Sequence, residues 1–136
     1  MLEFFMNEEL EFIQRDDLYG ELAASVITEK RPDILAAGIA VGFVGSYKKK
    51  VVSKDHIVFG ECKKVQEIYK LYCPYDFLIV IYEQNTAGFN DDQMKILIWH
   101  ELNHIGIDEK GKAYKKAHDV EEFDDIIKEC GLNWNR

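Results

Sequence analysis

The stretch NDDQMKILIWHELNHI, residues 90–105, decides the fold. Asn90 is suited to cap a helix, because its side chain can accept a hydrogen bond from the first turn. Gln93 stands three residues later, where the partner in a capping box stands. Gly106 follows the stretch, and glycine is common just past a helix end. We therefore predict a helix that begins at Asn90 and ends near Ile105.

The segments upstream of this helix have the composition of strands. Residues 77–82, FLIVIY, form a continuous apolar run that is typical of a central strand covered on both faces. Residues 38–46 and 57–64 are also predicted strands, and a lysine-rich turn separates them. We expect these three strands to form one mainly antiparallel sheet. Apolar and aromatic residues recur at helical spacing over residues 65–72, which predicts a short helical turn.

Two further helices are predicted near the ends of the chain. Residues 8–30 carry a loose apolar stripe after Asn7, a possible N-cap, and Arg31-Pro32 ends that helix because proline disfavours the α conformation of its predecessor. A polar loop over 108–117 leads to a last helix that begins near Asp119 and ends at Gly131. The prediction is one α+β domain over residues 1–136.

Composition limits the class of protein. The chain has 136 residues, which suits a single domain, and 17 basic against 25 acidic residues give a net charge of −8. This excess of acid argues against nucleic acid as a partner. The sequence contains no run long and apolar enough for a membrane span and no basic N-terminal leader. Its three cysteines form no C-x-x-C pair, so we expect reduced thiols and a cytoplasmic location.

The motif His100-Glu101-Leu102-Asn103-His104 carries the predicted chemistry. Side chains four residues apart on a helix share one face, so His100 and His104 can reach a single Zn²⁺ ion. Glu101 stands beside the first ligand, where its carboxylate can act as a general base toward an activated water. The H-E-x-x-H spacing on a helix is typical of zinc-dependent hydrolysis. His56 has no partner at ligand spacing, and we expect it to be structural.

A catalytic zinc usually has three protein ligands. His118 is the leading candidate for the third, because it stands directly before the start of the last predicted helix, where a neutral imidazole is favoured. Glu122 is the next candidate, since zinc sites with two histidines and a glutamate also occur. Asp119 and Glu121 are further candidate oxygen ligands, and Asp119 could instead be a carboxylate that orients an imidazole.

These segments together resemble a known family. The resemblance lies in HELNHIG, in the later HDVEEF and the IIKECGLNW that follows it, and in FGECKKV and YDFLIVIYE upstream. Over roughly residues 20–134, the chain resembles the phage metallopeptidase family. HDVEEF is also similar to the segment that supplies the third histidine in SprT-like and WLM-type peptidases. The resemblance implies a small zincin-like fold, a zinc peptidase activity and ligation by His118. The chain lacks the cysteine zinc ribbon of those relatives.

The expected function is hydrolysis of peptide bonds by a zinc-activated water, with a peptide or protein as substrate. The expected location is the cytoplasm of a bacterium or of a phage-infected host cell. One alternative is a zinc-stabilised interaction module without turnover, in which Asp119 or Glu122 completes the metal shell. Another is a DNA-associated protease of the SprT-like kind, which the net charge of −8 opposes. Tyr114 lies in the loop after the motif, but no residue is assigned as a second oxyanion donor, and no sequence pattern defines an oligomeric state.

Overall fold

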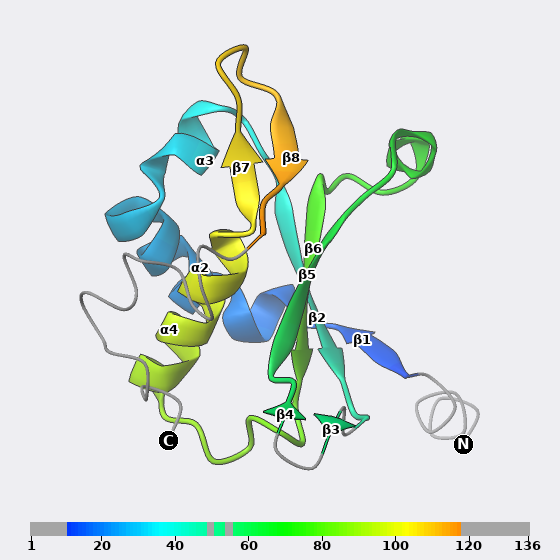
Figure 1. Cartoon of the computed structure of the whole chain (residues 1–136), viewed down its shortest axis with the longest axis vertical. Helices are drawn as coiled ribbons and strands as arrows, with labels where there is room; N and C mark the ends of the chain where they lie inside the picture. The colour runs from blue at the N-terminus through cyan, green and yellow to red at the C-terminus, as the bar shows by residue number, and fades with distance from the viewer. Residues whose placement is uncertain (1–10, 49–50, 54–55, 118–136) are drawn as a thin grey trace.

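A computed structural model describes residues 11–48, 51–53 and 56–117. A four-stranded sheet forms one layer, and the helices form the other layer on one of its faces (Figure 1). Helix α2 (Asp16–Lys30) and helix α4 (Asp91–Leu102) pack against each other in the helical layer, and the short helix α3 (Pro32–Ala36) follows α2. The protein is therefore α+β, as the sequence predicted.

The sheet has the strand order β1-β2-β6-β5, formed by Phe12–Gln14, Val41–Ser46, Phe77–Tyr82 and Gly60–Lys64. β1 is antiparallel to β2, β2 is parallel to β6, and β5 is antiparallel to β6. The sheet thus has four strands rather than the predicted three, and it is mixed: two of its three pairings are antiparallel and the central β2–β6 pairing is parallel. The two apolar strands β2 and β6 take the centre, while β5, with Lys63 and Lys64, takes an edge, where charged residues are favoured.

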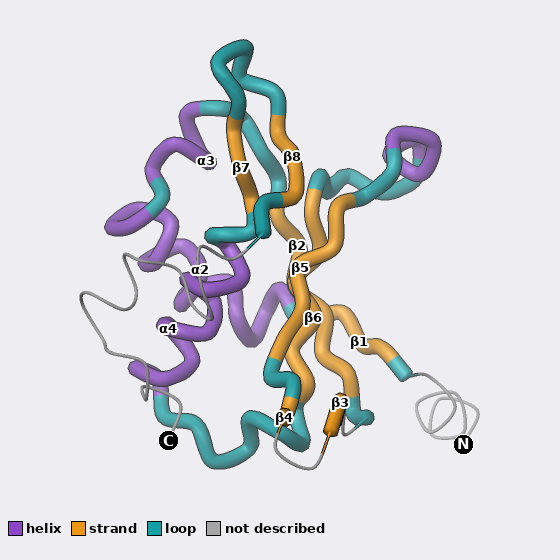
Figure 2. Tube along the Cα trace, viewed as in Figure 1, coloured by secondary structure: helices purple, strands orange, loops and turns teal. Residues whose placement is uncertain are grey.

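Three smaller elements complete the described chain. Strands β3 (Val51–Ser53) and β4 (His56–Ile57) form one hairpin, so the strand predicted over 57–64 is divided between β4 and β5. The predicted helical turn over 65–72 is present as a 3₁₀ helix, η1 (Glu67–Leu71). Strands β7 (Ile105–Ile107) and β8 (Ala113–Lys115) form a second hairpin directly after α4 (Figure 2). The polar loop predicted over 108–117 therefore contains a strand.

The N-terminal helix starts later than predicted. The predicted range 8–30 contains β1, and α2 begins only at Asp16, because residues 12–14 add to the edge of β2. The Oδ1 of Asp16 accepts the N–H of Phe43 at 2.7 Å, which fixes the helix start to that strand. α2 ends at Lys30, as the Arg31-Pro32 pair predicted, and α3, which was not predicted, begins at Pro32. Asn7 lies outside the described residues.

The start of α4 is as predicted, but its end is not. The side chain of Asn90 accepts the N–H of Gln93 at 2.8 Å, and the Gln93 side chain accepts the N–H of Asn90 at 3.0 Å, which completes the capping box. The helix ends at Leu102 rather than near Ile105. Gly106 belongs to β7 instead of capping the helix. The predicted C-terminal helix lies outside the described residues.

The core lies between the sheet and the helices. Alternate residues of β6 point toward α2 and α4, and the buried apolar cluster includes Tyr19, Ala23, Val26, Ile34, Phe43, Cys62, Phe77, Ile79, Ile81, Leu97, Ile98, Trp99, Leu102 and Ile105. This packing fixes the last turns of α4 against the middle of the sheet. Within the described ranges, no helix is long and apolar enough to cross a bilayer.

Candidate metal centre

The structure brings His100, Glu101 and His104 together at the C-terminal end of α4. One ligand atom from each side chain lies within 4.8 Å of the others. The Nε2 of His100 lies 3.9 Å from one carboxylate oxygen of Glu101, and the Nε2 of His104 lies 4.0 Å from the other. The carboxylate therefore faces both imidazoles, whose ring centroids lie 5.4 Å apart, and the three side chains are close enough to hold one ion.

Lys116 fixes both the backbone and the ring of His104. The backbone N–H of Lys116 donates to the carbonyl of His104 at 2.5 Å, which extends the β7–β8 pairing by one step. The Nδ1 of His104 lies 2.6 Å from the carbonyl oxygen of Lys116. Since a carbonyl can only accept, Nδ1 carries the proton and Nε2 carries the lone pair. A backbone carbonyl in this position orients a metal-binding imidazole and fixes its tautomer.

Glu101 is almost completely buried, with 3% of its surface exposed, and it lies against the edge strand β5. A Cβ atom at Gly60 would stand 3.3 Å from the Oε2 of Glu101 and 3.0 Å from the carbonyl oxygen of Val80. Because glycine has no side chain, it leaves a gap beside the Glu101 carboxylate that a Cβ atom would close. Sequence reasoning assigned no role to Gly60, although a glycine inside a predicted strand indicates a close approach of this kind.

Cys62 lies two residues further along β5 and is buried. Burial is the main reason why the pKa of its thiol is raised to about 12, and the nearby Glu101 carboxylate raises it further, while Lys115 opposes the rise. A neutral, buried thiol is a weak nucleophile. Cys62 and Cys73 are both free thiols, and Cys130 lies outside the described residues.

The remaining residues considered from the sequence are placed only in part. His118, Asp119 and Glu122 lie outside the described residues, so the third ligand stays a prediction. His56 stands in β4. The ring of Tyr114 lies directly over Gly106, its partner across the β7–β8 hairpin, where an added Cβ would overlap the ring.

The donor set fits a divalent metal ion. Two imidazole nitrogens and a carboxylate are ligands that zinc and similar ions accept, and the imidazole of His104 is held in the tautomer that ligation by Nε2 requires. His100 and His104 would hold the ion. Glu101, next to both and buried, would face a water or a substrate at the same place.

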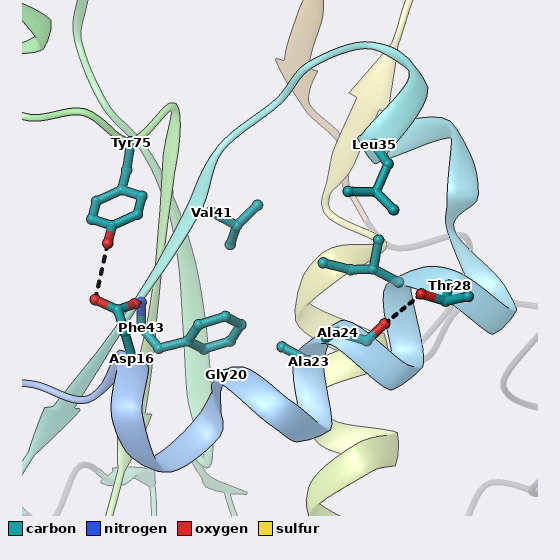
Figure 3. Close-up of a pocket in the computed structure, with 10 residues that line it drawn as sticks. Asp16, Gly20, Ala23, Ala24, Thr28, Leu35, Val41, Phe43 and Tyr75 are labelled. Carbon is teal, nitrogen blue, oxygen red and sulfur yellow. Dashed lines mark hydrogen bonds between the residues drawn. The ribbon is translucent and has the colours of Figure 1, made fainter.

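A separate hollow of about 320 Å³ opens between α2, α3 and β2 (Figure 3). Its wall is mainly apolar, and at one end the Oδ2 of Asp16 accepts the hydroxyl of Tyr75 at 3.1 Å. Neither histidine of the motif nor Glu101 lines it. The hollow is therefore not part of the candidate metal centre.

Comparison with protein families adds the remaining observation. The model of a family described as "Putative phage metallopeptidase" matches residues 10–136. The chain belongs to this family. The family description indicates a metal-dependent peptidase, and membership confirms the resemblance seen in the HELNH and HDVEEF segments. No curated protein and no solved structure matched the chain.

Proposed function

We propose that the protein is a zinc-dependent peptidase in which Glu101 is the general base. One observation carries the proposal: a buried carboxylate faces two imidazoles, 3.9 and 4.0 Å from their Nε2 atoms. His100, His104 and, by the prediction from the sequence, His118 hold the ion. When bound, Zn²⁺ supplies Lewis acidity that activates a water and polarises a carbonyl.

The residues of the chain then move one proton. The Glu101 carboxylate takes it from the attacking water and returns it to the nitrogen of the leaving amine. Burial of Glu101 limits competing solvent, and the Gly60 gap keeps the carboxylate next to the imidazoles. The protonated Nδ1 of His104 stays bonded to the carbonyl of Lys116 throughout, so the ring does not rotate.

The edge of β5 that no described strand pairs with is the proposed binding surface for the peptide. Among the strands that the structure describes, β5 pairs with β6 alone. Tyr82 N–H donates to the Phe59 carbonyl, and Val65 N–H donates to the Asp76 carbonyl, so these residues face inward. By alternation, the backbone groups of Gly60, Cys62 and Lys64 face outward. An extended peptide can add to this edge and pass directly beside Glu101.

The experiment is metal analysis followed by cleavage. Untagged protein is reconstituted with Zn²⁺, its metal content is measured, and a peptide library is incubated with it and read by mass spectrometry. We expect close to one zinc per chain and zinc-dependent cleavage, both abolished by a strong chelator. Protein that retains no transition metal after reconstitution would refute the proposal. Zinc retention without cleavage of any peptide would favour the non-catalytic interaction module.

The same assay also addresses the partner. A peptide or protein substrate in the bacterial or phage-infected cytoplasm is the proposed setting. Cleavage that requires added DNA would instead support the DNA-associated protease. The net charge of −8 makes us expect no such stimulation.

A further inference from the structure

The second histidine of the motif lies outside the helix that carries the first. Helix α4 ends at Leu102, and Asn103 and His104 form a turn before β7 begins at Ile105. The N–H of Asn103 still donates to the carbonyl of Trp99 at 3.0 Å, and the N–H of His104 donates to the carbonyl of Glu101 at 3.1 Å, so the helix holds the N–H side of the turn. Other parts of the chain bind the carbonyl groups around the turn, and Lys116 provides only one side of these contacts.

Arg31, between α2 and α3, provides the other side. Its Nη1 donates to the carbonyl of Leu102 at 2.8 Å and to the Oδ1 of Asn103 at 3.2 Å. Its Nη2 donates to the carbonyl of Ile105 at 2.7 Å. The other two donors go to the carboxylate of Asp33, both at 3.0 Å. All five N–H donors of the guanidinium are therefore used.

These acceptors surround His104 along the chain. The last carbonyls of a helix have no partner inside the helix, and a cation near them is favoured by the helix dipole. The pKa of the Asp33 carboxyl is lowered chiefly by its hydrogen bond with Arg31, so the pair is charged at neutral pH. The guanidinium has little exposure, with 14% of its side chain accessible. The contact joins the turn rigidly to the α2–α3 corner.

We propose that Arg31 is a positioning residue of the metal site, which holds residues 102–105 so that His104 stays one helical turn from His100. The proposal rests on the proposed function for its metal. Arginine is required because its planar fork reaches acceptors on the turn and on Asp33 at once. Lysine would keep the charge but would reach only some of these acceptors.

The test compares Arg31→Lys and Arg31→Gln with two controls. Arg15→Lys changes another arginine, whose guanidinium lies 3.2 Å from the carboxylate of Glu83 and does not contact the turn. Val26→Ala removes part of a buried side chain and so lowers stability through the core. Zinc affinity is measured by competition with a chromogenic chelator, at a temperature where circular dichroism shows each variant folded. The visible spectrum of the Co²⁺-loaded protein reports ligand geometry. Hydrogen exchange of the amides of residues 103–105 is measured in metal-free protein.

We expect both Arg31 variants to bind zinc at least about 10-fold more weakly, the lower end of the effect of changes around metal ligands. Their Co²⁺ spectra should differ from that of the unmodified protein, and residues 103–105 should exchange faster. Both controls should keep the affinity and the spectrum. If Arg31→Lys kept the zinc affinity and the Co²⁺ spectrum of the unmodified protein, the positioning role would be wrong.

Hydrogen exchange separates this inference from the proposed function. If the unmodified protein bound no zinc, the proposed function would fail, and the role of Arg31 toward the metal would fail with it. Faster exchange in Arg31→Lys would then still show that the guanidinium holds the turn. Unchanged exchange in Arg31→Lys would overturn the positioning role whatever the metal result.

Discussion

Gly60 on β5 and Glu101 on α4 approach so closely that an added Cβ at position 60 would stand 3.3 Å from the Oε2 of Glu101. The carbonyl oxygen of Val80 on the neighbouring strand would lie 3.0 Å from the same Cβ. A side chain at this position therefore contacts the backbone on one side and the carboxylate on the other. The carboxylate is the more movable of the two, so it is the group that we expect to shift.

Gly60→Ala is expected to lower kcat by up to about 10-fold, because the Glu101 carboxylate has to shift by a few tenths of an ångström, and a misplacement of about 1 Å costs about 100-fold. KM for a peptide and the zinc content should change little. Steady-state kinetics checks this, with Gly88→Ala as the matched control, since a Cβ there meets nothing within 4 Å. An unchanged kcat in Gly60→Ala would show that the gap at position 60 has no catalytic role.

Glu101→Gln should keep the metal and lose hydrolysis. The amide is close in size to the carboxylate but cannot take a proton, and general-base catalysis contributes about 10²- to 10⁴-fold in rate. Elemental analysis and single-turnover cleavage measure the two effects separately. A folded Glu101→Gln protein without zinc would identify Glu101 as a ligand rather than a base.

The third ligand is tested by a pair of substitutions outside the described residues. His118→Ala should bind zinc much more weakly, because it removes one of three predicted ligands, while its circular dichroism stays near that of the unmodified protein. Glu122→Ala should keep zinc and lose about 1 kcal/mol or less through a weaker helix start. Competition with a chromogenic chelator decides between them. The reverse result would make the third ligand a carboxylate.

Cys62 should resist thiol reagents in the folded protein. Its thiol is buried and its pKa is raised to about 12, so almost none of it is thiolate at pH 8. Cys73 is partly exposed and should react faster. Peptide mapping after a timed pulse of iodoacetamide reports each site, and denatured protein gives the reference rate. Equal labelling of Cys62 and Cys73 in folded protein would contradict the described burial.

Sequence reasoning succeeded where the interaction is local. The capping box joins Asn90 to Gln93, and the apolar run over 77–82 needs cover on both faces wherever it lies. The spacing of His100, Glu101 and His104 placed their side chains together, as found. Each of these features depends on residues within a few positions of one another.

The features that were missed depend on contacts between distant residues. β1 has helical spacing in sequence but is a strand because Ile13 pairs with Gly45 on β2. Gly106 suggested a helix end near Ile105, yet α4 stops at Leu102, where Arg31 and Lys116 take the backbone groups of the turn. Arg31 itself was considered only as the residue before Pro32. No local pattern reports these partners.

The loop that carries η1 is closed at its base and exposed along its length. The N–H of Val65 donates to the carbonyl of Asp76 at 2.9 Å, and none of the η1 residues is buried. Tyr72 beside it is 94% exposed. Exposed loop tips of this kind tolerate insertion, because the backbone pairing that holds their ends is independent of what they carry. We expect residues 67–72 to accept a short affinity tag or a fluorophore-binding peptide. Such an insertion would allow the protein to be immobilised without altering the motif from His100 to His104.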